Sequence, residues 1–154
     1  MNAMKSNLIL MADDDADDRL LVQDALGDCH DLEPRIHFVA DGEELMDYLF
    51  RRNGYAAAGS APTPGLILLD LNMPRKDGRE ALREIRACAE LRHIPVVMFT
   101  TSKADTDIAS TYDLGANSFV SKPTAYDSLV KIMGALTHYW FGVVELPQPR
   151  TKPA

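Results

Sequence analysis

Residues 66–78 read LILLDLNMPRKDG, and their pattern is the clearest indication of the fold class. The run LILL is apolar at every position, which indicates a strand covered on both faces, as in a parallel sheet. It stops at an acid, Asp70, and the Asp-x-Asn-x-Pro segment that begins there is typical of a turn. A helical pattern follows at residues 79–90, with apolar side chains on one face at Leu82, Ile85 and Ala89. A buried strand, a turn and an amphipathic helix together form one unit of an α/β fold.

The same unit recurs on both sides of this stretch. Apolar runs predict further strands at residues 8–12 (LILMA), 35–40 (RIHFVA), 96–99 and 118–121. Helical patterns follow them at residues 17–27, from Asp41 to the Asn53-Gly54 pair, at 105–114 and at 125–140, with Asp41 and Glu44 as a capping box. Five strands that alternate with five helices predict a parallel sheet with right-handed crossovers.

Two segments fall outside this alternation. Residues 53–65 (NGYAAAGSAPTPG) are rich in Ala, Gly, Ser and Pro, which predicts a long surface loop. Residues 147–154 contain three prolines and predict a flexible tail. We therefore expect one domain over residues 1–146.

The composition excludes several classes of protein. The chain is 46% apolar and 25% charged, as ordinary globular proteins are. Its apolar runs are too short to span a bilayer and its first residues lack a secretory pattern, so we expect a cytoplasmic protein without membrane contact. A net charge of −7 argues against nucleic acid as a partner. Cys29 and Cys88 show no paired spacing and are expected to be reduced thiols.

Polar side chains follow four of the predicted strands, namely Asp13 and Asp14, Asp70, Thr100, and Lys122. Ligands of parallel α/β sheets bind at the carboxyl ends of strands, so we expect these side chains to lie together. Each has an ordinary alternative explanation. An acid can cap a turn, threonine is a common strand residue, and a lysine before proline is usually solvated. Their joint position favours a functional site.

The two acids after the first strand indicate a cation site. Asp13 and Asp14 repel each other unless a positive charge offsets them, and Mg²⁺ is held by few carboxylates and several waters. The neighbouring Asp15, Asp17 and Asp18 are explained by a solvated loop and a helix N-terminus, where carboxylates are favoured.

A carboxylate beside such an ion can act as a nucleophile on phosphorus. In this position Asp70 would form an aspartyl phosphate. Thr100 can donate its hydroxyl to one phosphoryl oxygen, and Lys122 can pair with another.

The acidic pair, LILLDLNMPRKDG, PVVMFTT (residues 95–101) and GANSFVSKP (residues 115–123) together resemble the receiver domain of two-component response regulators. The resemblance runs from about residue 8 to about residue 140, in the same order and spacing. It implies a flavodoxin-like (βα)5 three-layer sandwich with a parallel sheet in the order 2-1-3-4-5. It also implies a phosphoacceptor signalling domain that catalyses only its own phosphotransfer and dephosphorylation. The donor would be a sensor histidine kinase or a histidine phosphotransfer protein.

The resemblance assigns a role to each matched position. Asp70 matches the phosphorylated aspartate, and Asp13, Asp14 and the backbone carbonyl of Asn72 match the groups that join Asp70 around Mg²⁺. Lys122 matches the phosphoryl-pairing lysine.

Two further positions match the switch of that family. Thr100 matches the switch hydroxyl, and Phe119 stands at the position of the switch aromatic, although a plain core-edge aromatic would look the same in the sequence. The bond from Lys122 to Pro123 resembles the family's cis peptide.

A narrower resemblance is to the small stand-alone regulators that partner bacterial phytochrome kinases. The Ala/Pro loop before the third strand, DLNMPRKDGRE and the ending HYWFGVVELP carry it. It implies a phytochrome-type kinase as the partner and output through protein contacts, with no DNA-binding output domain. The apolar cluster near the end either packs on its own helix or forms a homodimer contact through Tyr139, Trp140, Phe141 and Val143.

Three alternatives compete with this interpretation. A haloacid-dehalogenase-type phosphohydrolase would use Asp13 as its nucleophile, but Asp17 stands where that family favours Thr or Val. A calcium loop of the EF-hand type would use Asp13, Asp15, Asp17 and Asp24, but Asp18 replaces the required glycine. A purely scaffolding receiver is disfavoured because every chemical position holds a competent residue.

Overall fold

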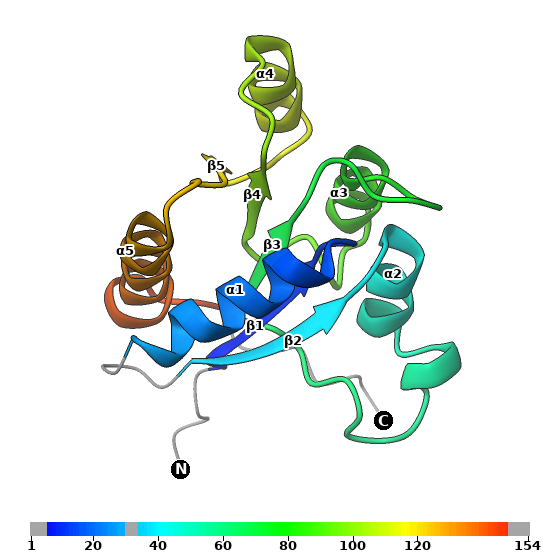
Figure 1. The fold of residues 1–154 in the computed structure, drawn as a ribbon. Helices are drawn as coiled ribbons and strands as arrows, with labels where there is room; N and C mark the ends of the chain where they lie inside the picture. Colours follow the sequence, from blue (N-terminus) through cyan, green and yellow to red (C-terminus); the bar gives the residue numbers. More distant parts are fainter. Residues whose placement is uncertain (1–5, 30–33, 148–154) are drawn as a thin grey trace.

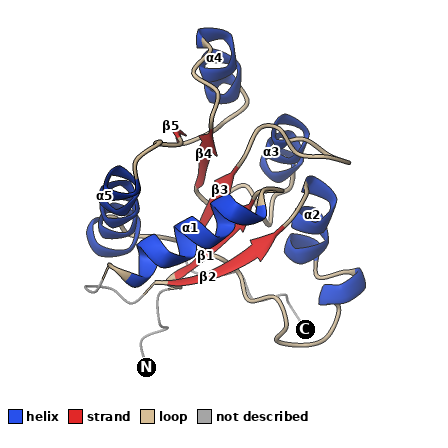
Figure 2. Cartoon of the chain, in the orientation of Figure 1, coloured by secondary structure: helices blue, strands red, loops and turns tan. Residues whose placement is uncertain are grey.

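The computed structural model describes residues 6–29 and 34–147. A five-stranded parallel sheet has the order β2-β1-β3-β4-β5, as expected (Figure 2). Its strands are β1 (Leu8–Ala12), β2 (Arg35–Val39), β3 (Leu66–Leu69), β4 (Val96–Thr100) and β5 (Ser118–Ser121). The predicted flavodoxin-like fold is thereby confirmed. Residues 148–154, the greater part of the predicted tail, lie outside the described residues.

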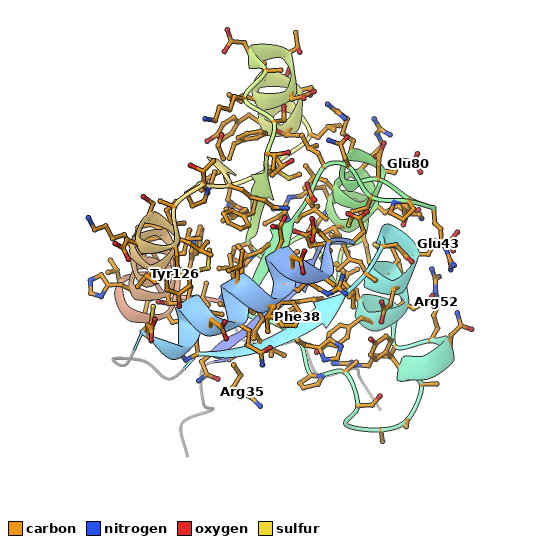
Figure 3. All side chains as sticks on the ribbon, viewed as in Figure 1. Arg35, Phe38, Glu43, Arg52, Glu80 and Tyr126 are labelled. Atoms are coloured by element: carbon orange, nitrogen blue, oxygen red, sulfur yellow. The ribbon has the colours of Figure 1, made fainter. Side chains whose placement is uncertain are left out.

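Helices cover both faces of this sheet. Figure 1 shows α1 (Ala16–Gly27) beside α5 (Tyr126–Thr137) and α2 (Gly42–Phe50) beside α3 (Gly78–Ala87). The remaining helix, α4 (Asp105–Asp113), contacts β5 at the edge opposite β2. Charged side chains such as Glu43 and Glu80 project from the outer sides of α2 and α3 (Figure 3). The result is a three-layer arrangement.

Strand alternation divides the core in two. Ile9 and Met11 of β1 pack with Leu66 and Leu68 toward the side of α1 and α5. The intervening Leu10 and Ala12, with Ile67 and Leu69, pack toward α2 and α3. Because both faces are covered, β1, β3 and β4 are buried along their whole length, which explains the unbroken apolar runs.

Aspartate side chains begin three of the helices. Asp15, Asp41 and Asp77 each accept a hydrogen bond from a backbone N–H in the first turn of α1, α2 and α3. At α2 the expected capping box forms in a shifted version. Asp41 accepts from Glu44 N–H, while the Glu44 carboxylate accepts from Ala40 N–H and not from Asp41 N–H.

The C-terminal ends of three helices differ from the predictions. Helix α2 ends at Phe50, before the Asn53-Gly54 pair, because Arg51 adopts a left-handed conformation with φ of 55°. Helix α3 spans Gly78–Ala87 and is shorter than expected. Helix α5 ends at Thr137, and a π-helical turn continues over His138–Val143. Among the described residues, no helix has both the length and the apolar character needed to cross a bilayer.

Candidate functional site

Sheet register brings four polar residues to one edge of the sheet. Asp13 directly follows β1, Asp70 follows β3, Thr100 ends β4 and Lys122 follows β5. Backbone hydrogen bonds extend the ladder through these positions. Asp70 N–H donates to Ala12 O at 3.1 Å, and Lys122 N–H donates to Thr100 O at 2.7 Å. The expected convergence at the carboxyl ends of the strands is therefore present.

Three carboxylates form an acidic cluster at this edge. One oxygen from each of Asp13, Asp14 and Asp70 lies within 4.8 Å of the other two. Asp13 and Asp70 are buried, whereas Asp14 is exposed. An all-oxygen donor set that is open to solvent on one side suits a hard divalent ion that keeps part of its water shell. The residues present thus fit a Mg²⁺ or Mn²⁺ ion.

Lys122 supplies a positive charge to this cluster. Its Nζ lies 2.6 Å from Asp13 Oδ2 and 3.3 Å from Asp70 Oδ2. Burial alone would lower the pKa of Lys122, but its bonds with Asp13 and Asp18 and the charge of Asp70 raise that pKa above the ordinary value. The ammonium is therefore held in its charged form beside the Asp70 carboxylate.

Backbone and side-chain donors fix Asp13 in place. Its Oδ1 accepts a hydrogen bond from Asp15 N–H at 2.9 Å, and its carbonyl accepts one from Arg19 Nη1 at 2.7 Å. Burial raises the pKa of Asp13, and the bonds with Lys122 and Asp15 offset this only in part. A cation bound here would favour the ionised form that burial opposes.

Thr100 is fully buried beside the acidic cluster. Within residues 6–29 and 34–147, its Oγ1 has no hydrogen-bond partner. A buried hydroxyl without a partner is costly and calls for an explanation such as a functional role.

Phe119 on the neighbouring strand is half-buried and packs against the core on the α2 and α3 side. Its backbone N–H donates to Tyr112 Oη at 3.2 Å, which ties β5 to α4.

The loop after Asp70 depends on a glycine that the sequence analysis missed. A Cβ at Gly78 would lie 2.2 Å from Asp70 O and 2.9 Å from Leu71 Cα. Gly78 N–H also donates to Leu71 O at 2.8 Å, so the start of α3 closes on the Asp70 backbone. The Asp-Gly pair of LILLDLNMPRKDG was a visible signal for this close approach. Asn72 is exposed in the same loop, and the metal contact of its carbonyl stays a prediction.

Two expectations about this site require correction. The cis peptide expected before Pro123 is absent, since every peptide bond in the described part of the chain is trans. The trans form of an X–Pro bond is intrinsically favoured. Asp18, attributed above to the solvated start of a helix, instead places Oδ2 at 2.8 Å from Lys122 Nζ.

The apolar cluster near the end of the chain is divided in two. Trp140 and Phe141 are half-buried and pack against the core on the α1 and α5 side. Tyr139 and Val143 remain 49% and 57% exposed. Packing on the chain itself therefore accounts for Trp140 and Phe141, whereas the homodimer contact stays a prediction for Tyr139 and Val143.

An acidic cluster and a lysine at the carboxyl edge of a 2-1-3-4-5 sheet are the features of a receiver-type signalling domain. The sequence profile described as the response regulator receiver domain matches residues 9–134, and the chain belongs to this family.

The chain is similar to several response regulators, among them a cyanobacterial phytochrome response regulator. The chain is 36% identical to response regulator Rcp1 of Synechocystis over 140 residues, which cover 91% of this chain and 92% of that protein. The phosphorylated cyanobacterial phytochrome response regulator RcpA superposes with a TM-score of 0.84 and 37% identity, covering 94% of this chain and 100% of RcpA. Response regulator RPA3017, which acts in red-light signalling of R. palustris, superposes with a TM-score of 0.86 and 35% identity. The match covers 92% of this chain and 98% of RPA3017. A further solved structure is the Mn²⁺-bound form of Rcp1, with a TM-score of 0.82 and 35% identity. The match covers 92% of this chain and 99% of the Rcp1 chain.

These findings bear on the alternatives. The EF-hand hypothesis is wrong, because Asp17 and Asp24 lie within helix α1 and not in a loop. Family membership disfavours the haloacid-dehalogenase hypothesis with Asp13 as nucleophile.

Proposed function

We propose that this protein accepts a phosphoryl group on Asp70 from a phosphohistidine of a sensor histidine kinase and signals through phosphorylation-dependent protein contacts. One observation carries the proposal. The Asp70 carboxylate lies beside the Lys122 ammonium at 3.3 Å and within a cluster of two further acids. This is the environment that an in-line transfer of a phosphoryl group to a carboxylate needs.

Phosphotransfer forms one bond and breaks one bond. An Asp70 carboxylate oxygen forms the new O–P bond while the N–P bond to the kinase imidazole breaks and its electron pair returns to nitrogen. Lys122 pairs with one phosphoryl oxygen and neutralises part of its charge. Hydrolysis of the same O–P bond returns the protein to its starting state.

A divalent ion, Mg²⁺ in the cell, is the expected cofactor. Asp13, Asp14, Asp70 and the Asn72 carbonyl would hold it. When bound, it screens the repulsion between the Asp70 oxygen and the incoming phosphoryl oxygens.

Thr100 and Phe119 would convert the charge change into a conformational change. The Thr100 hydroxyl, which has no hydrogen-bond partner among the described residues, can donate to a phosphoryl oxygen on Asp70, and this gain is specific to the phosphorylated state. Movement of Thr100 changes the space next to β5, where Phe119 pairs in register with Met98 of β4. The two-state element is thus the β4–β5 edge of the sheet.

The likeness to Rcp1, RcpA and RPA3017 supports a phytochrome-type kinase as the donor, acting in the cytoplasm, directly or through a histidine phosphotransfer protein. A homodimer contact through the exposed Tyr139 and Val143 is the further part of this proposal. We also propose one receiver domain over residues 1–146, followed by a tail.

Phosphotransfer from a panel of purified phytochrome-type kinases tests the function. Wild-type protein should take up label stoichiometrically with Mg²⁺, and Asp70→Asn should take up none. The matched control Asp24→Asn removes an exposed carboxylate from α1 and should be labelled normally. Uptake of label by the Asp70→Asn variant would reject Asp70 as the phosphorylation site.

Molecular mass measured with and without phosphorylation tests the proposed homodimer. The double variant Tyr139→Ser/Val143→Ser is expected to be monomeric.

A further inference from the structure

A third carboxylate reaches the lysine of the acceptor site. Lys122 Nζ lies 2.8 Å from Asp18 Oδ2, a shorter distance than the 3.3 Å to Asp70 Oδ2. Asp13 Oδ2, at 2.6 Å, is the remaining partner. The proposed phosphotransfer assigns Asp13 and Asp70 to the site and leaves Asp18 without a role.

The cap of α1 explains why Asp18 turns toward Lys122. Asp18 is the third residue of α1 after the cap Asp15, where an acid usually accepts a hydrogen bond from the N–H of the cap residue. Here Asp15 N–H donates to Asp13 Oδ1 at 2.9 Å instead. Asp15 Oδ1 accepts from Asp17 N–H and Asp18 N–H, which fixes the backbone of this turn. The Asp18 carboxylate is therefore held in position and is available to Lys122.

Three carboxylates surround the Lys122 ammonium. Lys122 Nζ donates hydrogen bonds to Asp18 Oδ2 and Asp70 Oδ2, whereas Asp13 Oδ2 is an ion-pair partner that accepts no hydrogen bond within the described residues. A phosphoryl oxygen on Asp70 that approaches Lys122 therefore competes with these carboxylates for the ammonium. Asp13 is completely buried and would be left as an unpaired buried charge, whereas the Asp18 side chain is 30% exposed and can be hydrated on release. Asp18 is the exchangeable partner.

We propose that Asp18 is a positioning residue that retains the Lys122 ammonium in the unphosphorylated protein and releases it when a phosphoryl group arrives on Asp70. This inference rests on the proposed phosphorylation of Asp70. Competition by Asp18 slows phosphoryl capture, and its charge opposes the incoming phosphoryl oxygens. Asp18 thereby sets the rate at which the receiver is loaded.

Phosphorylation by the small donor phosphoramidate, followed by intact-protein mass spectrometry, tests this role without a kinase interface. Asp18→Asn should load faster than wild type by about five-fold, as expected for removal of one charge a few ångström away in a partly screened site. Asp17→Asn makes the same charge change in the same helical turn. In the described part of the chain Asp17 is not a contact of Lys122, and this variant should stay within about two-fold of wild type. Asp18→Glu keeps the charge and should keep the slow rate.

A second measurement separates competition for Lys122 from a general structural effect. Beryllofluoride, a phosphoryl mimic, should bind Asp18→Asn more tightly than wild type in the presence of Mg²⁺. In a Lys122→Gln background, the change of Asp18 to Asn should increase the affinity by a smaller factor, since the shared partner is gone and only the repulsion by the Asp18 charge is removed. If wild-type protein loads on Asp70 but Asp18→Asn loads no faster than Asp17→Asn, the inference is overturned while the proposed function stands. A wild-type protein that never loads on Asp70 would refute the function itself.

Discussion

Replacing Thr100 by valine should stabilise the metal-free protein while impairing the switch. Thr100 has no exposed surface, and no hydrogen bond to its Oγ1 exists within the described residues. Mutational data put the cost of burying an unbonded hydroxyl at roughly 1–3 kcal/mol. Valine keeps the shape and replaces the hydroxyl by a methyl group, so Thr100→Val should raise the free energy of unfolding by about 1 kcal/mol.

Urea denaturation in EDTA measures this change, and a thermal scan should show a rise in Tm of about 2–4 °C for a chain of this size. Thr111→Val is the matched control. Thr111 is equally buried, but its Oγ1 donates to Asp107 O at 2.8 Å and to Ile108 O at 3.0 Å. Loss of these bonds should lower the free energy of unfolding by about 1 kcal/mol, so the two variants differ in sign.

The same pair of variants tests the role of the hydroxyl in the activated state. Beryllofluoride with Mg²⁺ should stabilise wild type and Thr111→Val by the same increment, since the ligand binds only the folded protein. The increment should be smaller for Thr100→Val, which lacks the donor. If Thr100→Val destabilises the metal-free protein as much as Thr111→Val does, the Thr100 hydroxyl is satisfied in solution and the reasoning is refuted.

Three further perturbations test the acidic edge of the sheet. Gly78→Ala places a Cβ against Asp70 O and should lower the free energy of unfolding by about 2 kcal/mol; an unchanged urea midpoint would contradict this packing. Because burial raises the pKa of Asp13 above 3.8, the folded state binds its proton more tightly than the unfolded chain does. Ionisation of Asp13 should therefore reduce the stability of metal-free wild type relative to Asp13→Asn as the pH rises from about 3.8 through the raised pKa, and urea denaturation of both proteins over this pH range measures the difference. Asp14→Ala should weaken binding of Mg²⁺ and Mn²⁺ by about 10-fold or more in calorimetry, whereas Asp17→Ala, which removes a neighbouring exposed acid, should not.

The local sequence was enough to predict the alternation of strands and helices. Strands β1, β3 and β4 are apolar at nearly every position because both faces of the sheet are covered, and this produces a signal that no neighbouring segment shares. The change from apolar to polar residues at the end of each strand likewise located Asp13, Asp70 and Lys122. Strand order came from resemblance to a family, since the apolar runs do not say which strands are neighbours.

Helix ends were predicted less well, because they depend on single backbone conformations and on distant contacts. The left-handed Arg51 ends α2 at a residue type that carries no stop signal. Phe141 and Trp140 pack against the core from the turn that follows α5, so the last apolar cluster resembled a continuing helix in the sequence.

The α/β class, the edge of the sheet that holds the chemistry and the residue types available there follow from the amino-acid sequence alone. How these residues pair depends on the packing of the elements. Lys122 and Asp18 are 104 positions apart, and their contact depends on the orientation of α1 relative to β5. The close approach of Gly78 to Asp70 O depends in the same way on surrounding elements, as does the lack of a hydrogen-bond partner for the Thr100 hydroxyl within the described part of the chain. Periodicity reports which side of an element is buried, whereas partner and distance are set by how elements pack, and that information is spread over the whole chain.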